Sequence, residues 1–299
     1  MRRRLLCTCS SGKFEEYCCA QGLQVKVTPH SFKSEQDRQE IIRNLQISSQ
    51  FEMRHRGIFL FYGKDFISYK LENPRGQERN EFLRLISRFM SFYLDDSCPT
   101  SWKNCTPMFW EEFITTVCPL HLCISPQQKQ VEKFFYQLKK FVRWLDKREG
   151  TSWTPVILEF LKKYQDELKM CERLLNGLFL LQFPNIHKPD WDYQKDLNKL
   201  EEKYLSIQDP IESIFEIQSV IGNITIVTDL HDGRNYKVDG IPCSADMVGL
   251  LLNGAIGKFG GALLWNWYHT LGVYPQRSKI FLKMYDVWDV VAAPSEINK

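Results

Sequence analysis

Four cysteines near the start of the chain are the residues whose types and spacing point most directly to a chemistry. Cys7, Cys9, Cys18 and Cys19 follow the spacing C-x-C-x8-C-C. Four thiolates at about 2.3 Å form a standard tetrahedral zinc site, and the excursion between the two pairs lets a short peptide fold back around one ion. Gly12 lies in that excursion, where a tight turn favours positive φ. The sequence therefore predicts one zinc ion, which is structural because four thiolates leave no open coordination position.

Other cysteine chemistries fit this segment less well. Disulfides are typical of secreted, cysteine-dense chains, and the basic start at Arg2, Arg3 and Arg4 is not followed by the apolar stretch of a signal peptide. A redox C-x-x-C pair is absent from the segment. Ten cysteines without a leader indicate a reducing compartment, so we expect a cytoplasmic protein.

The cysteine segment resembles the SEC-C motif, the short zinc-binding tail of the SecA translocation ATPase, which also occurs at the ends of otherwise unrelated bacterial proteins. The resemblance covers about the first 20 residues of 299 and implies Cys7, Cys9, Cys18 and Cys19 as the ligands, with Ser11 and Gly12 in the turn. The family's first glycine is Ser10 here, and its usual aromatic position holds Glu15. In SecA the motif contacts a chaperone partner and the ribosome, so the resemblance implies a protein or ribosomal partner.

A second group of cysteines has no standard metal spacing. Cys98, Cys105, Cys118 and Cys123, with His121 between the last two, follow C-x6-C-x12-C-x4-C, which differs from known zinc signatures. Buried free thiols are the simpler interpretation of this group, and a second metal site remains the alternative.

Catalytic signatures are not recognisable in the sequence. It contains no H-E-x-x-H, G-x-S-x-G, Walker A or Rossmann fingerprint. Carboxylates stand beside imidazoles at His187–Asp192 and Asp229–Asp232, but such short clusters are typical of turns. We therefore predict an interaction protein and nominate no catalytic residue.

Nucleic-acid binding is the alternative function. The net charge of +3 is only mildly basic, yet one predicted helix concentrates cations near Trp144 and Trp153. These cations are Lys139, Lys140, Arg143, Lys147 and Arg148. A solvated helix face is the simpler interpretation of these cations. Small β-barrels, which we expect in the C-terminal region, also often bind oligonucleotides.

Hydrophobic periodicity predicts an α+β protein. A zinc knuckle (1–22) precedes a short helix and a β-hairpin (23–75), with the hairpin strands at 57–62 and 66–71 around Gly63-Lys64-Asp65. Period 3.6 then predicts a helical domain (76–208), with helices beginning at Thr106-Pro107, Ser125-Pro126 and Thr154-Pro155.

The last region (209–299) is predicted as a small β-barrel or bent antiparallel sheet with a C-terminal helix at 278–288. Turns are expected at Asp232-Gly233, Asn253-Gly254 and Gly260-Gly261, and a bulge at Gly222. The apolar stretch 247–267 holds Lys258, whose insertion at a bilayer centre would cost about 3 kcal/mol. We therefore predict no membrane span.

Overall fold

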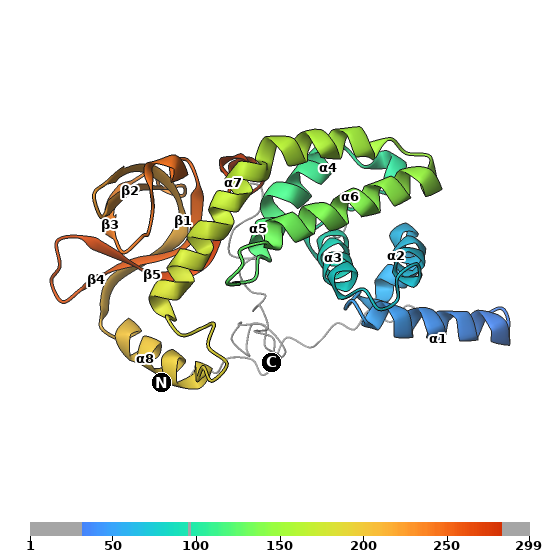
Figure 1. The fold of residues 1–299 in the computed structure, drawn as a ribbon, viewed down its shortest axis with the longest axis horizontal. Helices are drawn as coiled ribbons and strands as arrows, with labels where there is room; N and C mark the ends of the chain where they lie inside the picture. Colours follow the sequence, from blue (N-terminus) through green and yellow to red (C-terminus); the bar gives the residue numbers. More distant parts are fainter. Residues whose placement is uncertain (1–31, 95–96, 283–299) are drawn as a thin grey trace, which may run out of the picture.

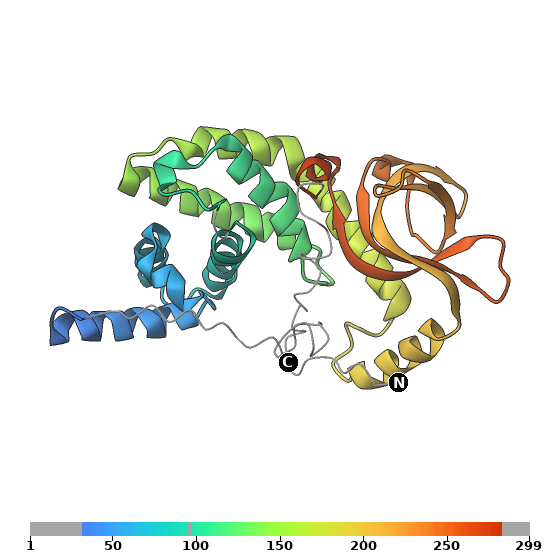
Figure 2. The ribbon, with the colours of Figure 1, turned by 180° about the vertical axis from the view of Figure 1, so that it is seen from behind.

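The structure is a computed structural model that describes residues 32–94 and 97–282. A layer of helices precedes a β-barrel, and helix α7 runs from one to the other (Figure 1). The view from behind shows the same arrangement, with α9 beside the barrel where it meets the helices (Figure 2). The predicted α+β class is confirmed. The predicted zinc knuckle (1–22) lies outside the described residues.

The first helices pack around one aromatic core. Its buried side chains include Phe66, Phe89, Trp110 and Phe141, each no more than 1% exposed. The helices are α1 (Glu35–Ser49), α2 (Phe61–Leu71), α3 (Gln77–Arg88), α4 (Pro107–Glu112), α5 (Cys118–Leu120), α6 (Gln130–Glu149) and α7 (Trp153–Gln182). Short 3-10 turns at His55–Phe59 and Trp102–Asn104 and π-helical turns at Phe89–Tyr93 and Phe113–Val117 complete the layer.

Helices α6 and α7 form a pair in which each supplies the N-terminal cap of the other. At the end of α6, the Asp146 carboxylate accepts hydrogen bonds from the Trp153 and Thr154 amides, both at 2.8 Å. In the middle of α7, the buried Glu172 carboxylate accepts from the Gln130 amide at 2.8 Å, where α6 begins. Carboxylates satisfy the amides that a helix start leaves without partners and favour its dipole.

The predicted helix starts are partly corrected by these caps. Thr106 caps α4 by accepting from the Phe109 amide, as expected. Helix α6 begins at Gln130 rather than at Ser125-Pro126, and α7 begins at Trp153, just before Thr154. The cap of α6 comes from Glu172, 42 residues away, and the cap of α7 comes from Asp146, seven residues before Trp153. Neither carboxylate stands at the N-cap position next to the helix, where a local sequence pattern would indicate it.

The predicted β-hairpin at 57–71 is wrong, because this segment forms a 3-10 turn and helix α2. Tyr62, Phe66 and Tyr69 lie on one helical face and are almost fully buried. Gly63, expected in the hairpin turn, sits where α2 meets the preceding turn. A Cβ at this position would lie 2.2 Å from the carbonyl oxygen of Gly57, so the glycine is required for packing rather than for a turn.

Five strands form a closed barrel after the charged helix α8 (Tyr193–Tyr204). They are β1 (Ile207–Ile221), β2 (Ile224–Asp229), β3 (Asn235–Asp239), β4 (Leu251–Phe259) and β5 (Trp265–Tyr274). The order around the barrel is β1-β2-β3-β5-β4. The long β1 pairs with β2 through its C-terminal part and along most of its length with β4, which closes the barrel. A small β-barrel was one of the two predicted forms.

The turns of the barrel are predicted correctly at two of four positions. Asp232-Gly233 connects β2 and β3, and Gly260-Gly261 connects β4 and β5, with positive φ at all three glycines. Gly222, predicted as a bulge, instead forms the turn between β1 and β2 at φ 60°. The predicted turn at Asn253-Gly254 is wrong, since β4 runs through it.

Gly254 lies in the barrel wall at a position that has no space for a side chain. A Cβ there would lie 2.1 Å from the carbonyl oxygen of His269 and 2.5 Å from the indole of Trp267. The residue pairs with Thr270 across the β4–β5 register. The segment 247–267 therefore contains strand β4, the turn after it and the start of β5. No helix of the described residues has the length and apolar composition to cross a membrane.

The end of the barrel is fastened to the helices by polar contacts. After β5, Arg277 lies 2.7 Å from the buried Glu111 of α4, and the Ser278 hydroxyl donates to the carbonyl of Thr115. The Glu111 carboxylate also accepts from the Tyr164 hydroxyl of α7. The last described helix, α9 (Lys279–Leu282), begins as predicted and ends where the described residues end.

We predict that Asp146→Asn lowers the free energy of unfolding by about 1 kcal/mol at pH 7. Burial alone would raise the pKa of Asp146, but hydrogen bonds from Thr151, Thr154 and Trp153 outweigh it and lower this pKa. The stabilisation is therefore present above the unfolded pKa of about 3.9 and is lost as pH falls through the lower folded pKa. The measurement is urea unfolding of both proteins at a series of pH values.

Asp166→Asn is the matched control, because Asp166 lies exposed on the same helix pair. The control should leave stability within about 0.5 kcal/mol of wild type. Equal stability of Asp146→Asn and Asp166→Asn at pH 7 would show that the proposed cap does not stabilise α7.

Candidate functional site

The four cysteines of the predicted zinc site, Cys7, Cys9, Cys18 and Cys19, lie outside the described residues. The second cysteine group, the imidazole–carboxylate clusters and the basic helix face lie within the described ranges.

The cysteines of the second group do not come together as a set of metal ligands. Cys105 and Cys118 are buried, Cys98 is half-buried and Cys123 is exposed. Among residues 32–94 and 97–282 no cluster of three or more His, Cys, Asp or Glu side chains could hold a metal. Burial, with Cys98 nearby, raises the pKa of the Cys105 thiol to about 12, and burial raises that of Cys118 well above its usual value. These thiols are protonated at neutral pH and behave as buried apolar side chains.

The two segments in which carboxylates stand beside imidazoles, Asp229–Asp232 and His187–Asp192, lie in a turn and in a loop. In Asp229–Asp232 the Asp229 carboxylate accepts hydrogen bonds from the Ser213 hydroxyl and from the His231 amide at 2.8 Å. His187 is exposed in the loop before α8. His121 is half-buried, and the resulting desolvation, with Arg88 and Arg84 nearby, lowers its pKa to about 4. It is therefore neutral at physiological pH.

Some residues of the predicted basic helix face pack against other helices, whereas others are exposed to solvent. The Nε atom of Arg148 lies 3.0 Å from the buried Asp65 carboxylate, which also accepts from the Trp102 indole. Trp144 packs against Tyr69, and the Trp153 indole donates to the Trp102 carbonyl. These side chains hold α2 and the Trp102 turn against the α6–α7 pair.

The exposed part is a line of side chains along α6, which we call the α6 stripe: Tyr136, Lys140, Arg143 and Lys147. Their spacing of three and four residues places them on one helix face, and all four are exposed. The Lys140 ammonium lies 4.2 Å from the centre of the Tyr136 ring. Lys140, Arg143 and Lys147 form no ion pair with another described residue within 4.0 Å. Lys139 is half-buried beside the stripe.

The barrel has the architecture of a class of nucleic-acid-binding domains. Strands β1, β2 and β3 follow one another and β4 returns beside β1, which is a Greek key. The OB-fold is a five-stranded Greek-key barrel that binds oligonucleotides on its β2–β3 face and adjoining loops.

On β3, alternation and burial place Asn235, Lys237 and Asp239 outward, and on β2 they place Ile224, Ile226 and Thr228 outward. This outer face thus has one cation, one carboxylate and no aromatic ring on which a base could stack. The chemistry expected of an oligonucleotide platform is therefore not present on these two strands.

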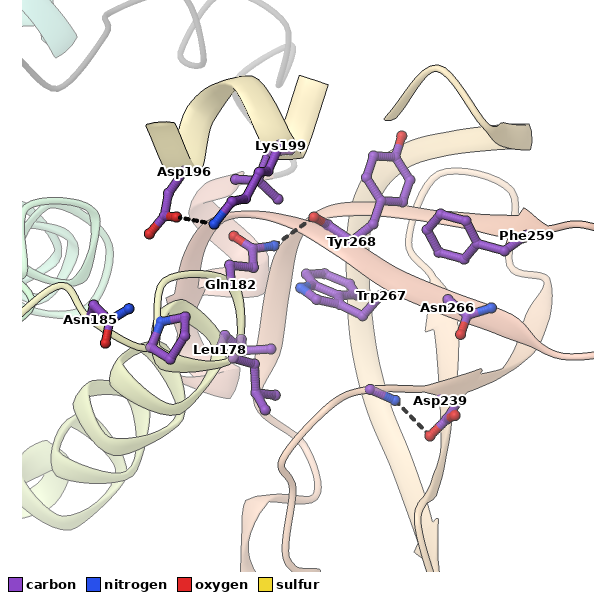
Figure 3. A pocket seen from close by; sticks show the side chains of 14 residues that line it. Leu178, Gln182, Asn185, Asp196, Lys199, Asp239, Phe259, Asn266, Trp267 and Tyr268 are labelled. Carbon is purple, nitrogen blue, oxygen red and sulfur yellow. Dashed lines mark hydrogen bonds and ion pairs between the residues drawn. The ribbon is translucent and has the colours of Figure 1, made fainter. Parts of the chain in front are cut away.

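A cavity of about 500 Å³ lies where the barrel meets α7 and α8 (Figure 3). The barrel supplies Phe259 from the end of β4 and Trp267 and Tyr268 from β5, while Asp239 stands at the end of β3. The helices supply apolar side chains from the end of α7 and the Asp196–Lys199 pair of α8, whose charged atoms lie 3.2 Å apart.

Hydrogen bonds fix the walls of this cavity to one another. The Tyr268 carbonyl accepts from the Gln182 side chain at the end of α7 and from the Tyr204 hydroxyl at the end of α8, the latter at 3.0 Å. At the start of α8, the Trp191 indole donates to Asp196 at 2.9 Å, and its ring packs against Phe183. Both helices are therefore held directly to β5 or to each other around the cavity.

The sequence did not single out the residues of this cavity. Phe259, Trp267 and Tyr268 occur in strands, where aromatic residues are expected for packing alone. The available signal was the density of aromatic residues from Trp265 to Tyr268 beside a glycine-rich turn, which does not reveal that a distant helix encloses a cavity there.

Comparisons with protein-family models, with curated proteins and with solved structures find no match to this chain.

Proposed function

We propose that the chain is a zinc-binding interaction protein with a structural four-cysteine site of SEC-C type, which docks onto a protein or ribosomal partner. The observation that supports this proposal is the C-x-C-x8-C-C spacing of Cys7, Cys9, Cys18 and Cys19 beside Arg2–Arg4. The arginines offset the negative charge of four thiolates and add a basic surface for a partner. The body that accompanies this segment is a helical layer and a barrel joined by α7.

Elemental analysis of purified protein is expected to give about one zinc per chain, because four thiolates fill one tetrahedral site. Cys18→Ser together with Cys19→Ser removes two ligands and should abolish stoichiometric zinc. Cys123→Ser is the matched control, since Cys123 is exposed and lies outside the quartet, and it should retain the metal. Zinc near zero in wild-type protein never exposed to chelator would refute the site, and two per chain would return the second cysteine group to consideration.

The interaction itself is tested by affinity capture with the same variants. Wild-type protein and Cys123→Ser should recover a common partner, and the Cys18→Ser, Cys19→Ser variant should lose it because the docking module needs its metal to fold. Circular dichroism checks that the body stays folded. Identical partners for all three proteins would remove the cysteine module from recognition.

Nucleic-acid binding through the α6 stripe is the second candidate function. The observation that favours it is the alignment of Lys140, Arg143 and Lys147 on one exposed helix face, with no carboxylate of the described residues in ion-pairing distance. From Lys140 to Lys147 the cations of the stripe span about 10 Å, a length over which a nucleic-acid backbone presents more than one phosphate. Tyr136 adds an exposed ring beside these cations.

We predict that binding of a fluorescent duplex of DNA or RNA weakens about 40-fold between 50 and 200 mM salt if three phosphates are contacted. The triple variant Lys140→Gln, Arg143→Gln, Lys147→Gln should bind more weakly and lose about three units of the salt slope. The measurement is fluorescence anisotropy.

The control for this experiment changes net charge equally at exposed lysines away from the stripe, with Lys33→Gln, Lys188→Gln and Lys237→Gln. If wild-type protein does not bind at low salt, or if both triple variants weaken binding equally, the stripe is not a nucleic-acid site.

A further inference from the structure

The cavity between the barrel, α7 and α8 combines three kinds of chemistry on separate walls (Figure 3). Phe259, Trp267 and Tyr268 form the barrel side. Leucine side chains of α7 and α8, among them Leu178 and Leu200, form an apolar side. Asp239 and Asp196 place carboxylates at different parts of the lining, from β3 and from α8. A ligand must therefore match aromatic faces, an aliphatic wall and negative charge together.

The charge of the lining is negative. The lining contains two carboxylates, Asp196 and Asp239, and one ammonium, that of Lys199. That ammonium already lies 3.2 Å from an Asp196 oxygen. Hydrogen bonds from the Trp191 indole and from Lys199 lower the pKa of Asp196, so this carboxylate is charged at neutral pH. Asp239 accepts a hydrogen bond from the neighbouring Gly240 amide, and no cation of the described residues lies within ion-pairing distance of it. An anionic ligand would therefore be repelled overall.

Aromatic faces add to the attraction for a cation. The ring quadrupole places partial negative charge on the face of Trp, Tyr and Phe, which attracts ammonium and guanidinium groups within about 6 Å. The same barrel shows this contact directly, because the Lys258 ammonium lies 4.9 Å from the centre of the Trp265 ring.

The leucine side suits an alkyl chain that leads to the charged group. Leu181, at the end of α7, is 62% exposed and lines the opening, whereas Leu178 is buried one turn before it. An aliphatic stem could replace water along this side, at a gain of about 0.8 kcal/mol per buried methylene. The walls need no rearrangement to form the site, since the Tyr268 carbonyl holds the ends of both helices.

We propose that this cavity binds an organic cation, a guanidinium or ammonium group on an aliphatic chain, with its charge between the aromatic rings and the carboxylates. The cation comes either from an arginine or lysine side chain of a partner or from a free polyamine. The cavity shares no residue with the cysteine quartet or the α6 stripe, so this proposal is independent of both proposed functions.

Calorimetry on the full chain tests the proposal with three probes. N-acetyl-arginine methylamide represents a side chain, spermidine represents a polyamine, and N-acetyl-citrulline methylamide has the shape of the first without its charge. At least one cation is expected to bind with a Kd of about 1 mM or tighter, and the citrulline probe should bind at least about fourfold more weakly. Preference between the two cations distinguishes the sources.

Two charge variants make the test specific to the cavity. Asp239→Asn should weaken cation binding about fourfold, the effect of one charge at about 5 Å in a water-like dielectric. Lys199→Gln should strengthen it by a similar factor, because a competing cation is removed from the lining. Asp232→Asn, at the β2–β3 turn outside the cavity, is the matched control and should change nothing.

The expected direction of each effect also determines which results would contradict cation binding at the cavity. No binding of either cation, equal binding of the citrulline probe, or weaker cation binding in Lys199→Gln would overturn the proposal. Because Asp239 and Lys199 are exposed, neither variant removes a buried group, and an unchanged thermal transition confirms that both remain folded.

Discussion

Helix α7 takes part in the two largest hydrophobic cores of the described residues, and the rest of the described structure depends on that constraint. The N-terminal part of α7 places Ile157, Leu161 and Leu168 in the aromatic core of the helical layer. Its C-terminal part places Leu174 and Leu178 against the interior of the barrel. At about 1.5 Å per residue, its 30 residues span about 45 Å, which is long enough to reach from one core to the other. Each buried leucine contributes about 1.5–3 kcal/mol, so the two cores are energetically joined through one backbone.

Polar groups on α7 and its neighbours then set the positions of the other elements. Glu172 and Asn176 hold the segment that leads into α6, through the amides of Gln130 and Ser125. Gln182 at its end holds β5. The candidate cavity forms where the end of α7 and the end of α8 both donate hydrogen bonds to the Tyr268 carbonyl of β5. Function at that cavity would thus be sensitive to substitutions in either core.

Local sequence patterns were sufficient to predict the turns and caps that neighbouring residues determine. The Asp-Gly and Gly-Gly turns of the barrel and the cap at Thr106 need only neighbouring residues, and the structure contains them all. Gly63 and Gly254 misled the prediction because their cause is tertiary. At each position a carbonyl oxygen from another part of the backbone occupies the space that a Cβ would need. A single sequence does not distinguish a glycine required for this reason from a glycine required for a turn. The cavity was missed for the same reason, as its walls come from segments about 90 residues apart.

The closure of the barrel through β1 has a consequence for the order of folding. The α6–α7 pair can start to form at its short connection, where Trp153 meets Asp146 only seven residues away. By contrast, Ile207 at the start of β1 must meet Phe259 at the end of β4, and Gln182 on α7 must meet Tyr268 on β5, 86 residues later. Contacts of greater sequence separation form more slowly because loop closure costs entropy before it is repaid. During synthesis from the N-terminus, the helical layer can assemble while β4 and β5 are still unmade. The apolar half of α7 that faces the barrel, with Leu174 and Leu178, is then exposed until the last strands arrive, which makes it the natural surface for a chaperone to shield.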